Sequence, residues 1–242
     1  MQEKCLVIPC YNEANRIPLD QFTIHYQQSQ FNYCFVNDGS ADSTLSKLLD
    51  FRMGKEQNVL IVDCKINGGK SAAVREGMLQ ALAWKDFEIV GFADADLATP
   101  LYEIDRLVEL FNTDTQMVFG SRIKTLSTKI NRKIYRHYLG RIISTLISFF
   151  ILRLPIYDTQ CGIKLFRASL AREVFTDQFS TGWLFDVELF LRVKAELNEG
   201  ISRVIEVPLN EWDDKKDSKV SFLQGFGILS DFWWLFRNRK NK

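Results

Sequence analysis

Short apolar segments alternate with polar turns and helical patterns along the first half of the chain. The apolar runs are residues 4–9, 33–37, 58–63 and 88–93, and residues 116–122 form a fifth. Runs of this length without polar alternation are typical of strands that are buried on both faces, as in a parallel sheet. Their spacing leaves room for a helix between successive strands, which predicts βαβ crossovers.

Three segments between or after these runs have the three- and four-residue periodicity of amphipathic helices. They are residues 38–51, residues 67–86 after a Gly-Gly turn, and residues 99–111, where Pro100 suits a first helical turn. The pattern predicts an α/β fold with a central, mostly parallel sheet. We place one domain at residues 1–215 and an amphipathic, aromatic and basic tail at residues 216–242.

Composition narrows the function classes. The 242 residues are 46% hydrophobic and 25% charged, which is enough apolar material for one full core and argues against disorder. A net charge of +1 gives no general electrostatic reason to bind nucleic acid, so we expect no nucleic-acid partner. The five cysteines have no Cys-x-x-Cys spacing, and we interpret them as reduced core thiols.

No membrane-spanning segment is predicted. The N-terminal residues lack a basic region followed by a long apolar stretch, so we expect neither a signal peptide nor an anchor there. The longest apolar stretch, residues 142–152, contains three hydroxyl side chains and is far shorter than the roughly 20 residues that a spanning helix needs.

Polar motifs follow four of the predicted strands. In chain order they are PCYNE, NDGSADS, KINGGK and DADLATP. Ligands of open parallel sheets bind beyond the carboxyl ends of the strands, where the connecting loops converge. The sequence therefore predicts a binding site at this edge of the sheet.

Asp94 and Asp96 are the first candidates for chemistry. Two carboxylates at positions i and i+2 of an extended segment point to the same side and can share Mg²⁺ or Mn²⁺ with a phosphate ligand. The alternative is an Asp-rich turn that caps the following helix. Lys70 at a predicted helix start can attract an anion, although a solvated lysine is the simpler interpretation, and NGGKS lacks the Walker A frame of a P-loop.

The motifs together resemble family-2 glycosyltransferases of the polyprenyl-phosphate hexosyltransferase branch. The matching segments occur in the family's order over nearly the whole chain: VIPCYNE, NDGSADST, NGGKSAAVREGM, DADLATP, GSR and DTQCGIKLF. GWLFDVELF, and Trp212 followed by SKV, are most similar to dolichyl-phosphate glucosyltransferases, with dolichyl-phosphate mannose synthases as near relatives. The resemblance implies a nucleotide-diphospho-sugar transferase (GT-A) fold, which is Rossmann-like with a mixed sheet.

The resemblance also implies roles for individual residues. The nucleoside pocket would be lined by Pro9, Tyr11, Glu13 and Asp38. Asp94 and Asp96 would hold the metal ion at the diphosphate of a nucleotide-sugar donor, with Lys70 close to that donor.

The sequence departs from the family pattern at three positions. Asn37 replaces the first Asp of the common Asp-Asp-Gly-Ser form, and Ser71 replaces the second Gly of Gly-Lys-Gly. Ala98 stands where the mannose synthases often have a metal-binding Gln. The third departure argues against transferring the metal geometry of those enzymes directly.

A lipid-phosphate acceptor is already ionised near neutral pH, because the second pKa of a phosphate monoester is about 6. It therefore needs cations to position it rather than a strong general base. Arg122, Arg132 and Arg136 are the candidates, since arginine makes bidentate phosphate contacts. The alternative for these arginines is a solvated basic helix face.

Three further residues belong to the expected acceptor side. The resemblance places Gln160 and Lys164 along it. Asp186 resembles the catalytic carboxylate of relatives with hydroxyl acceptors, so it could act as a base or orient the acceptor, or simply be an acidic residue at a helix N-terminus.

The C-terminal tail contains an apolar, aromatic stripe that ends in cations. Its members recur every three or four residues: Phe222, Phe226, Leu229, Trp233 and Phe236, with Trp234 beside them and RNRKNK at the end. Such a pattern is typical of a helix at an anionic membrane surface, and residues 132–152 could form a second one. The alternative is that both stripes pack in the core or between subunits, so the oligomeric state is left open.

We therefore expect inverting transfer of a hexose, first of all glucose from UDP-glucose, to polyprenyl phosphate. The alternatives are transfer of mannose from GDP-mannose, transfer to a saccharide hydroxyl with Asp186 as base, and a sugar-nucleotide-binding scaffold without turnover. The lack of a predicted anchor favours a cytoplasmic enzyme that is peripheral on the inner face of a bacterial cell membrane.

Overall fold

The structure is a computed structural model that describes residues 3–29, 31–131, 134–215 and 224–238. Its main sheet has the strand order β3-β2-β1-β4-β7-β5-β8. The strands are β1 (Lys4–Cys10), β2 (Phe31–Asp38), β3 (Val59–Cys64), β4 (Ile89–Phe92), β5 (Met117–Ser121), β7 (Lys164–Arg167) and β8 (Val204–Pro208). Only β7 runs antiparallel to its neighbours. The predicted mixed, mostly parallel sheet and its first five strands are therefore confirmed.

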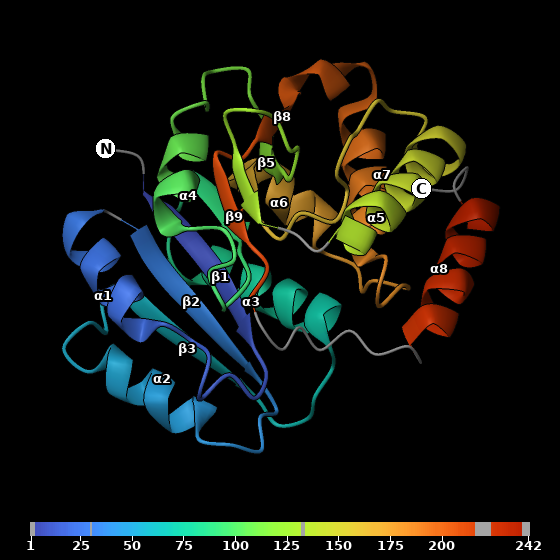
Figure 1. The fold of residues 1–242 in the computed structure, drawn as a ribbon. Coiled ribbons are helices and arrows are strands. Elements are labelled where there is room, and N and C mark those ends of the chain that lie inside the picture. The colour runs from blue at the N-terminus through green and yellow to red at the C-terminus, as the bar shows by residue number, and fades with distance from the viewer. Residues whose placement is uncertain (1–2, 30, 132–133, 216–223, 239–242) are drawn as a thin grey trace.

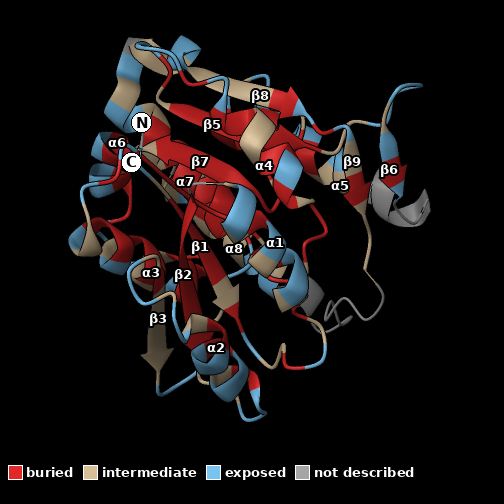
Figure 2. Cartoon of the chain, turned by 90° about the vertical axis from the view of Figure 1, so that its left-hand side faces the viewer, coloured by how far each residue is buried: buried red, intermediate tan, exposed pale blue. Residues whose placement is uncertain are grey.

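Helices cover both faces of the sheet (Figure 1). One face packs against α1 (Leu19–Gln28), α2 (Thr44–Arg52) and α4 (Leu101–Val108). The other packs against α3 (Lys70–Trp84), α6 (Ala168–Val174) and α7 (Phe185–Leu197). Figure 2 shows the central strands buried between these layers, which explains why their sequences are apolar on both faces.

The remaining elements lie at the carboxyl edge and side of this sandwich. A short parallel pair is formed by β6 (Lys129–Asn131) and β9 (Glu211–Asp213). Helix α5 (Ile134–Ile147) runs into a π-helical turn, η1 (Ser148–Leu152), and a 3₁₀ segment, η2 (Asn198–Arg203), precedes β8. The last element is α8 (Gln224–Asn238), which packs against η1 at the right of Figure 1.

The described side chains of the C-terminal tail, on helix α8, differ in their exposure. Leu235 is fully buried and Trp234 packs against the core, whereas Trp233 is 61% exposed. Phe222 lies outside the described residues, as do the side chains of Phe226 and Leu229. The helix thus contributes to the core while keeping an aromatic side chain on the surface; the domain boundary at 215/216 stays a prediction.

Strand direction brings the predicted motifs together. β1, β2, β3 and β4 are parallel, so the loops that follow them leave from one edge. Because β7 runs the other way, it starts at that same edge, with Lys164 paired to Phe92 at the end of β4. Within the described ranges, no helix has the length and hydropathy required to cross a bilayer.

Candidate active site

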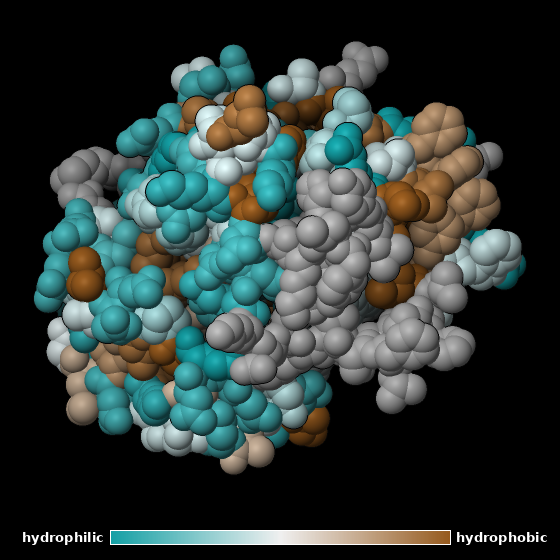
Figure 3. Space-filling view, viewed as in Figure 1, coloured by the Kyte–Doolittle hydropathy of each residue, from teal (hydrophilic) through white to brown (hydrophobic). Residues whose placement is uncertain are grey.

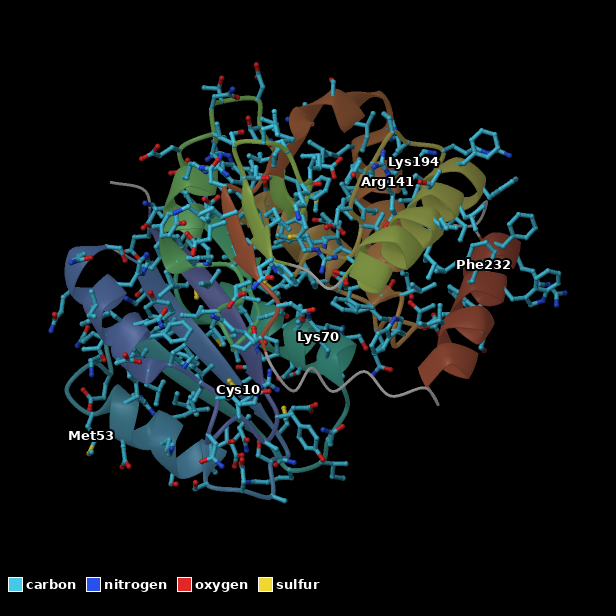
Figure 4. The ribbon with its side chains drawn as sticks, in the orientation of Figure 1. Cys10, Met53, Lys70, Arg141, Lys194 and Phe232 are labelled. Atoms are coloured by element: carbon cyan, nitrogen blue, oxygen red, sulfur yellow. The ribbon has the colours of Figure 1, made fainter. Side chains whose placement is uncertain are left out.

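A central cavity of about 840 Å³ opens at this edge of the sheet. Ten of the residues predicted from the sequence line it: Pro9, Tyr11, Glu13, Asp38, Lys70, Asp94, Asp96, Arg122, Gln160 and Asp186. They come from strand ends, loops and helix starts that are far apart in the chain, and the order and direction of the strands bring them to one edge. Figure 4 labels three residues of its lining: Cys10 at the end of β1, Lys70 at the start of α3 and Arg141 on α5.

Asp38 fixes the loop in front of α3. Its carboxylate accepts hydrogen bonds from the backbone N–H groups of Gly68 (2.8 Å) and Gly69 (2.9 Å). Gly69 has a φ of +82°, which favours glycine, and a Cβ at Gly39 (φ +63°) would lie 2.6 Å from the backbone nitrogen of Asn67. The polar motifs after β2 and β3 therefore hold each other in place, so that Lys70 begins α3 at the cavity.

Asp94 and Asp96 lie on a tight turn directly after β4. The backbone N–H of Ala98 donates to Asp96 Oδ1 (3.1 Å), and Leu97 has a positive φ of 50°, which is unusual for a residue with a branched side chain. Gly162 packs against the Asp94 carboxylate so closely that an added Cβ would lie 1.9 Å from Oδ2. The turn and this glycine together give both carboxylates their place in the cavity wall.

Each carboxylate of this pair has a cationic neighbour. Lys70 Nζ lies 2.5 Å from Asp94 Oδ1, and Arg16 Nη2 lies 3.0 Å from Asp96 Oδ2. Burial raises the pKa of Asp94, but Lys70 outweighs this effect and holds the pKa below its ordinary value. For Asp96, burial and the nearby charge of Asp94 leave the pKa above its ordinary value. A cation that binds this pair would therefore have to compete with Lys70 and Arg16.

The chemistry of the donor set fits a divalent cation that is shared with a ligand. In the part of the chain that the structure describes, no group of three or more His, Cys, Asp or Glu side chains is arranged to hold a metal ion. Two carboxylates on one turn, with room left by Gly162, match the mode in which Mg²⁺ or Mn²⁺ takes one or two carboxylates and completes its shell from phosphates and water.

Arg122, another residue of the cavity lining, is held in place by its contacts. Its Nε and Nη2 donate to the two oxygens of Asp158 (2.7 and 2.8 Å), and its guanidinium lies over the ring of Trp212, 5.3 Å from the centroid. Burial lowers the pKa of Arg122, but Asp158 outweighs it and the net shift is upward. The backbone N–H of Asp158 donates to Glu206 on β8 (2.8 Å), which fixes this loop to the sheet. Arg122 is therefore a permanent, pre-oriented cation.

Lys164 lies beneath the cavity rather than in its lining. Its side chain is 0% exposed, and Nζ donates to Asp186 Oδ1 and to the carbonyl of Cys161, both at 2.7 Å. Asp186, at the start of α7, is the partner that lines the cavity. Lys164, which the resemblance placed on the acceptor side, therefore acts on the cavity through Asp186.

A second, lateral cavity of about 860 Å³ lies beside the first, between η1, its following loop and α8. Phe149, Phe150 and Phe236 contribute to its apolar lining, and Arg153 is also part of it. Arg141 and Tyr157 line both cavities, and the Arg141 guanidinium lies over the Tyr157 ring, 5.1 Å from its centroid. Figure 3 shows brown and tan side chains gathered on this side of the molecule.

Several residues of the site were missed by sequence reasoning. Arg16, Arg141, Asp158, Gly162 and Trp212 are brought to the cavities or the carboxylates by the fold. Asp158, Gly162 and Trp212 lie in or next to motifs that had been noted, whereas Arg16 gave only a weak signal, its position three residues after Glu13. Arg132 lies outside the described residues, as does the side chain of Arg136.

The sequence profile described as Glycosyl transferase family 2 matches residues 5–175, which include β1 to β5, the Asp94–Asp96 turn and the Gly162 segment. The chain belongs to glycosyltransferase family 2. This membership confirms the resemblance drawn from the ordered motifs and makes the protein a glycosyltransferase by family.

Curated relatives of this chain include dolichyl-phosphate beta-glucosyltransferases. A dolichyl-phosphate beta-glucosyltransferase of Trichomonas vaginalis is 33% identical and is aligned over 88% of this chain and 65% of its own length. The Saccharomyces cerevisiae dolichyl-phosphate beta-glucosyltransferase is 31% identical, over 89% of this chain and 68% of the relative. The chain thus spans about two thirds of the length of these relatives.

Solved structures share the fold. Glucosyl-3-phosphoglycerate synthase from Mycobacterium tuberculosis, in complex with uridine diphosphate, superposes with a TM-score of 0.68 at 17% identity, covering 98% of this chain and 80% of that one. A mannosyltransferase from Pyrobaculum calidifontis, in complex with GDP-mannose and Mn²⁺, gives 0.62 at 16% identity, covering 100% and 65%. At these identities the likeness confirms the GT-A fold alone.

Proposed function

We propose that this protein is an inverting glycosyltransferase that moves glucose from UDP-glucose to a polyprenyl phosphate. One observation carries the proposal: a cavity lined by a carboxylate pair and a fixed arginine shares two lining residues, Arg141 and Tyr157, with a lateral, largely apolar cavity. The first cavity suits a charged donor, and the second suits a lipid chain. The named activity of the relatives that are about 30% identical supports the sugar and the acceptor class.

On the donor side, Asp94 and Asp96 would hold Mg²⁺ or Mn²⁺. Bound there, the cation would neutralise the negative charge that develops on the diphosphate leaving group. Lys70, at the N-terminus of α3, adds a positive charge and a helix dipole on the same side. Pro9, Tyr11, Glu13 and Asp38 form the wall that is assigned to the nucleoside.

On the acceptor side, cations position an acceptor that arrives already ionised. Arg122 is held by Asp158, and Arg141 lies where the two cavities meet. Asp186 already accepts a hydrogen bond from Lys164 through Oδ1, so we assign it to orienting this wall rather than to removing a proton. This assignment is consistent with a phosphate acceptor, because an ionised phosphate needs no base to remove a proton.

The lateral cavity would let the lipid chain leave toward a membrane surface. Phe149 is 71% exposed and Phe150 is half-exposed, with Arg141 and Arg153 in the same lining. Exposed aromatic side chains beside arginines are typical of attachment to anionic lipid. We therefore place the enzyme in the cytoplasm, peripheral on the inner face of the cell membrane.

The function is tested by a transfer assay with purified protein, polyprenyl phosphate in detergent and Mn²⁺ or Mg²⁺. Labelled UDP-glucose and GDP-mannose are supplied in separate reactions. We expect label in the lipid phase from UDP-glucose, loss of transfer in EDTA, and a drop of at least about 100-fold in Asp96→Asn. Label from GDP-mannose alone would reassign the donor, and transfer only to saccharides would reassign the acceptor.

The membrane proposal is tested by flotation with vesicles that contain anionic lipid. Replacing both Phe149 and Phe150 by Ser should weaken binding by about tenfold or more, because two apolar rings no longer enter the interface. The matched control replaces two other exposed apolar residues, Met53 and Leu126, by Ser. Equal loss in both double variants would contradict a defined membrane-facing surface.

A further inference from the structure

Arg16 lies between the predicted nucleoside wall and the carboxylate pair. It belongs to the loop between β1 and α1, and its Nη1 lies 3.5 Å from Glu13 Oε1 while Nη2 lies 3.0 Å from Asp96 Oδ2. The side chains of Arg16 and Asp96 are both 23% exposed, so this ion pair borders the open cavity rather than the core. An ion pair in such a position can exchange partners at little cost in stability.

Lys70 makes the equivalent contact with the other carboxylate. Its Nζ lies 2.5 Å from Asp94 Oδ1, and both side chains are 39% exposed. Asp94 and Asp96 are thus each paired with a positive side chain, one from the β1–α1 loop and one from the start of α3, and Arg16 also contacts Glu13. A divalent cation that binds both carboxylates must compete with these two side chains.

We propose that Arg16, together with Lys70, is a placeholder for the divalent cation: it neutralises Asp96 in the donor-free protein and moves to the donor diphosphate when metal and donor bind. The exchange is balanced in charge. The diphosphate brings the negative charge that Arg16 and Lys70 then contact, and the cation takes over the two carboxylates. The inference rests on the metal-dependent donor site of the proposed function and gives that site its order of assembly.

The consequence is coupling between metal and donor. Arg16 opposes the binding of metal alone but favours the binding of metal with diphosphate. By thermodynamic linkage, the diphosphate must then strengthen metal binding by the same factor by which metal strengthens diphosphate binding. The cation would therefore bind the two carboxylates tightly only when the donor is also bound.

The experiment measures Mn²⁺ binding to the full chain by the loss of the free Mn²⁺ electron paramagnetic resonance signal, with and without uridine diphosphate as the probe. In the wild type we expect weak binding without the nucleotide and tight binding with it. Arg16→Gln should bind Mn²⁺ about tenfold more tightly than wild type without nucleotide, and the gain from nucleotide should shrink by a similar or larger factor, equivalent to about 1.4 kcal/mol of coupling or more.

Two further variants make the result specific. Arg172→Gln removes one positive charge from an exposed ion pair with Asp86. Arg172 also contacts the carbonyl of Leu82, which lies about 18 Å along α3 from Lys70, so it controls for net charge alone. Asp96→Asn removes a proposed ligand and should abolish the tight binding.

The outcomes separate the two proposals. If Arg16→Gln matches Arg172→Gln, or binds Mn²⁺ more weakly than wild type without nucleotide, the placeholder inference is overturned while nucleotide-dependent, Asp96-dependent binding still supports the metal site. If wild type with nucleotide fails to bind Mn²⁺, or Asp96→Asn binds it as well, the metal site of the proposed function is overturned and the inference with it. Tighter Mn²⁺ binding in Arg16→Gln alone supports both.

Discussion

The two sides of the central cavity hold their charges in different ways. At the metal side, Arg16 and Lys70 pair with carboxylates in partly exposed contacts, with side chains 23% and 39% exposed. Lys164 with Asp186, beneath the cavity, and Arg122 with Asp158, in its lining, form ion pairs whose side chains are at most 11% exposed. The residue types are the same on both sides, but the surroundings differ.

This difference teaches which charges serve the fold and which serve the ligands. An exposed ion pair contributes roughly 0 to 1 kcal/mol and can open, whereas breaking a buried pair leaves an uncompensated charge in the interior. We therefore expect substitutions at the floor to lower stability and substitutions at the metal side to change binding. The following predictions probe that contrast.

The largest expected effect is at Lys164. Lys164→Met leaves the Asp186 carboxylate buried without its cation and should lower the free energy of unfolding by about 3 kcal/mol or more. The matched variant, Lys70→Met, breaks an exposed pair and should change unfolding by less than about 1 kcal/mol. Urea unfolding of both variants measures the difference, and similar losses in both would contradict the contrast.

A smaller effect is expected at Gly162, which packs against the carboxylate of Asp94. A Cβ at Gly162 would lie 1.9 Å from Asp94 Oδ2, so Gly162→Ala must turn this carboxylate away and should reduce transfer by about tenfold. Gly182 also lines the cavity, but an added Cβ there meets no atom within 4 Å. Initial rates should therefore separate Gly162→Ala from Gly182→Ala, and equal rates would show that the Asp94 position is not critical.

The smallest effect concerns Asp42, whose carboxylate links the loop after β2 to Ala14 in the loop after β1. Burial acts to raise the pKa of Asp42, but hydrogen bonds from Thr44 and Ala14 outweigh it and hold the pKa below its ordinary value. The ionised carboxylate therefore adds stability above its unfolded-state pKa, near 4, and this contribution is lost as pH falls through the lower folded value. Because Asp42 is exposed, solvent screens this contribution, and Asp42→Asn should be less stable than wild type by less than about 1 kcal/mol at pH 7.

The measurement for Asp42 is urea unfolding of wild type and Asp42→Asn at pH 7, 5 and 3. The difference between the two proteins should persist at pH 5 and shrink at pH 3, which lies below the unfolded-state pKa near 4, so that the carboxyl of the unfolded chain binds a proton. A difference that grows toward low pH would mean that the charge of Asp42 does not stabilise the loop contact.

The sequence by itself determined the sheet and the edge at which the cavity lies. Buried strands are readable because both faces must be apolar, and parallel strands place their following loops at one edge whatever the details of packing. For this reason the motifs around Asp38, Lys70 and Asp94 could be expected at one edge, and these three residues do line one cavity, while their roles stay predictions.

Tertiary structure alone decided the partners of those charges. Arg16 meets Asp96 across 80 positions of the chain, and Lys164 is buried because β7 runs antiparallel beside β4. Neither contact follows from local spacing, since each depends on how loops and strands from different parts of the chain pack. The same is true of the junction at Arg141 and Tyr157: the polarity of a segment is local, but the partner of a charge is set by the three-dimensional packing around it.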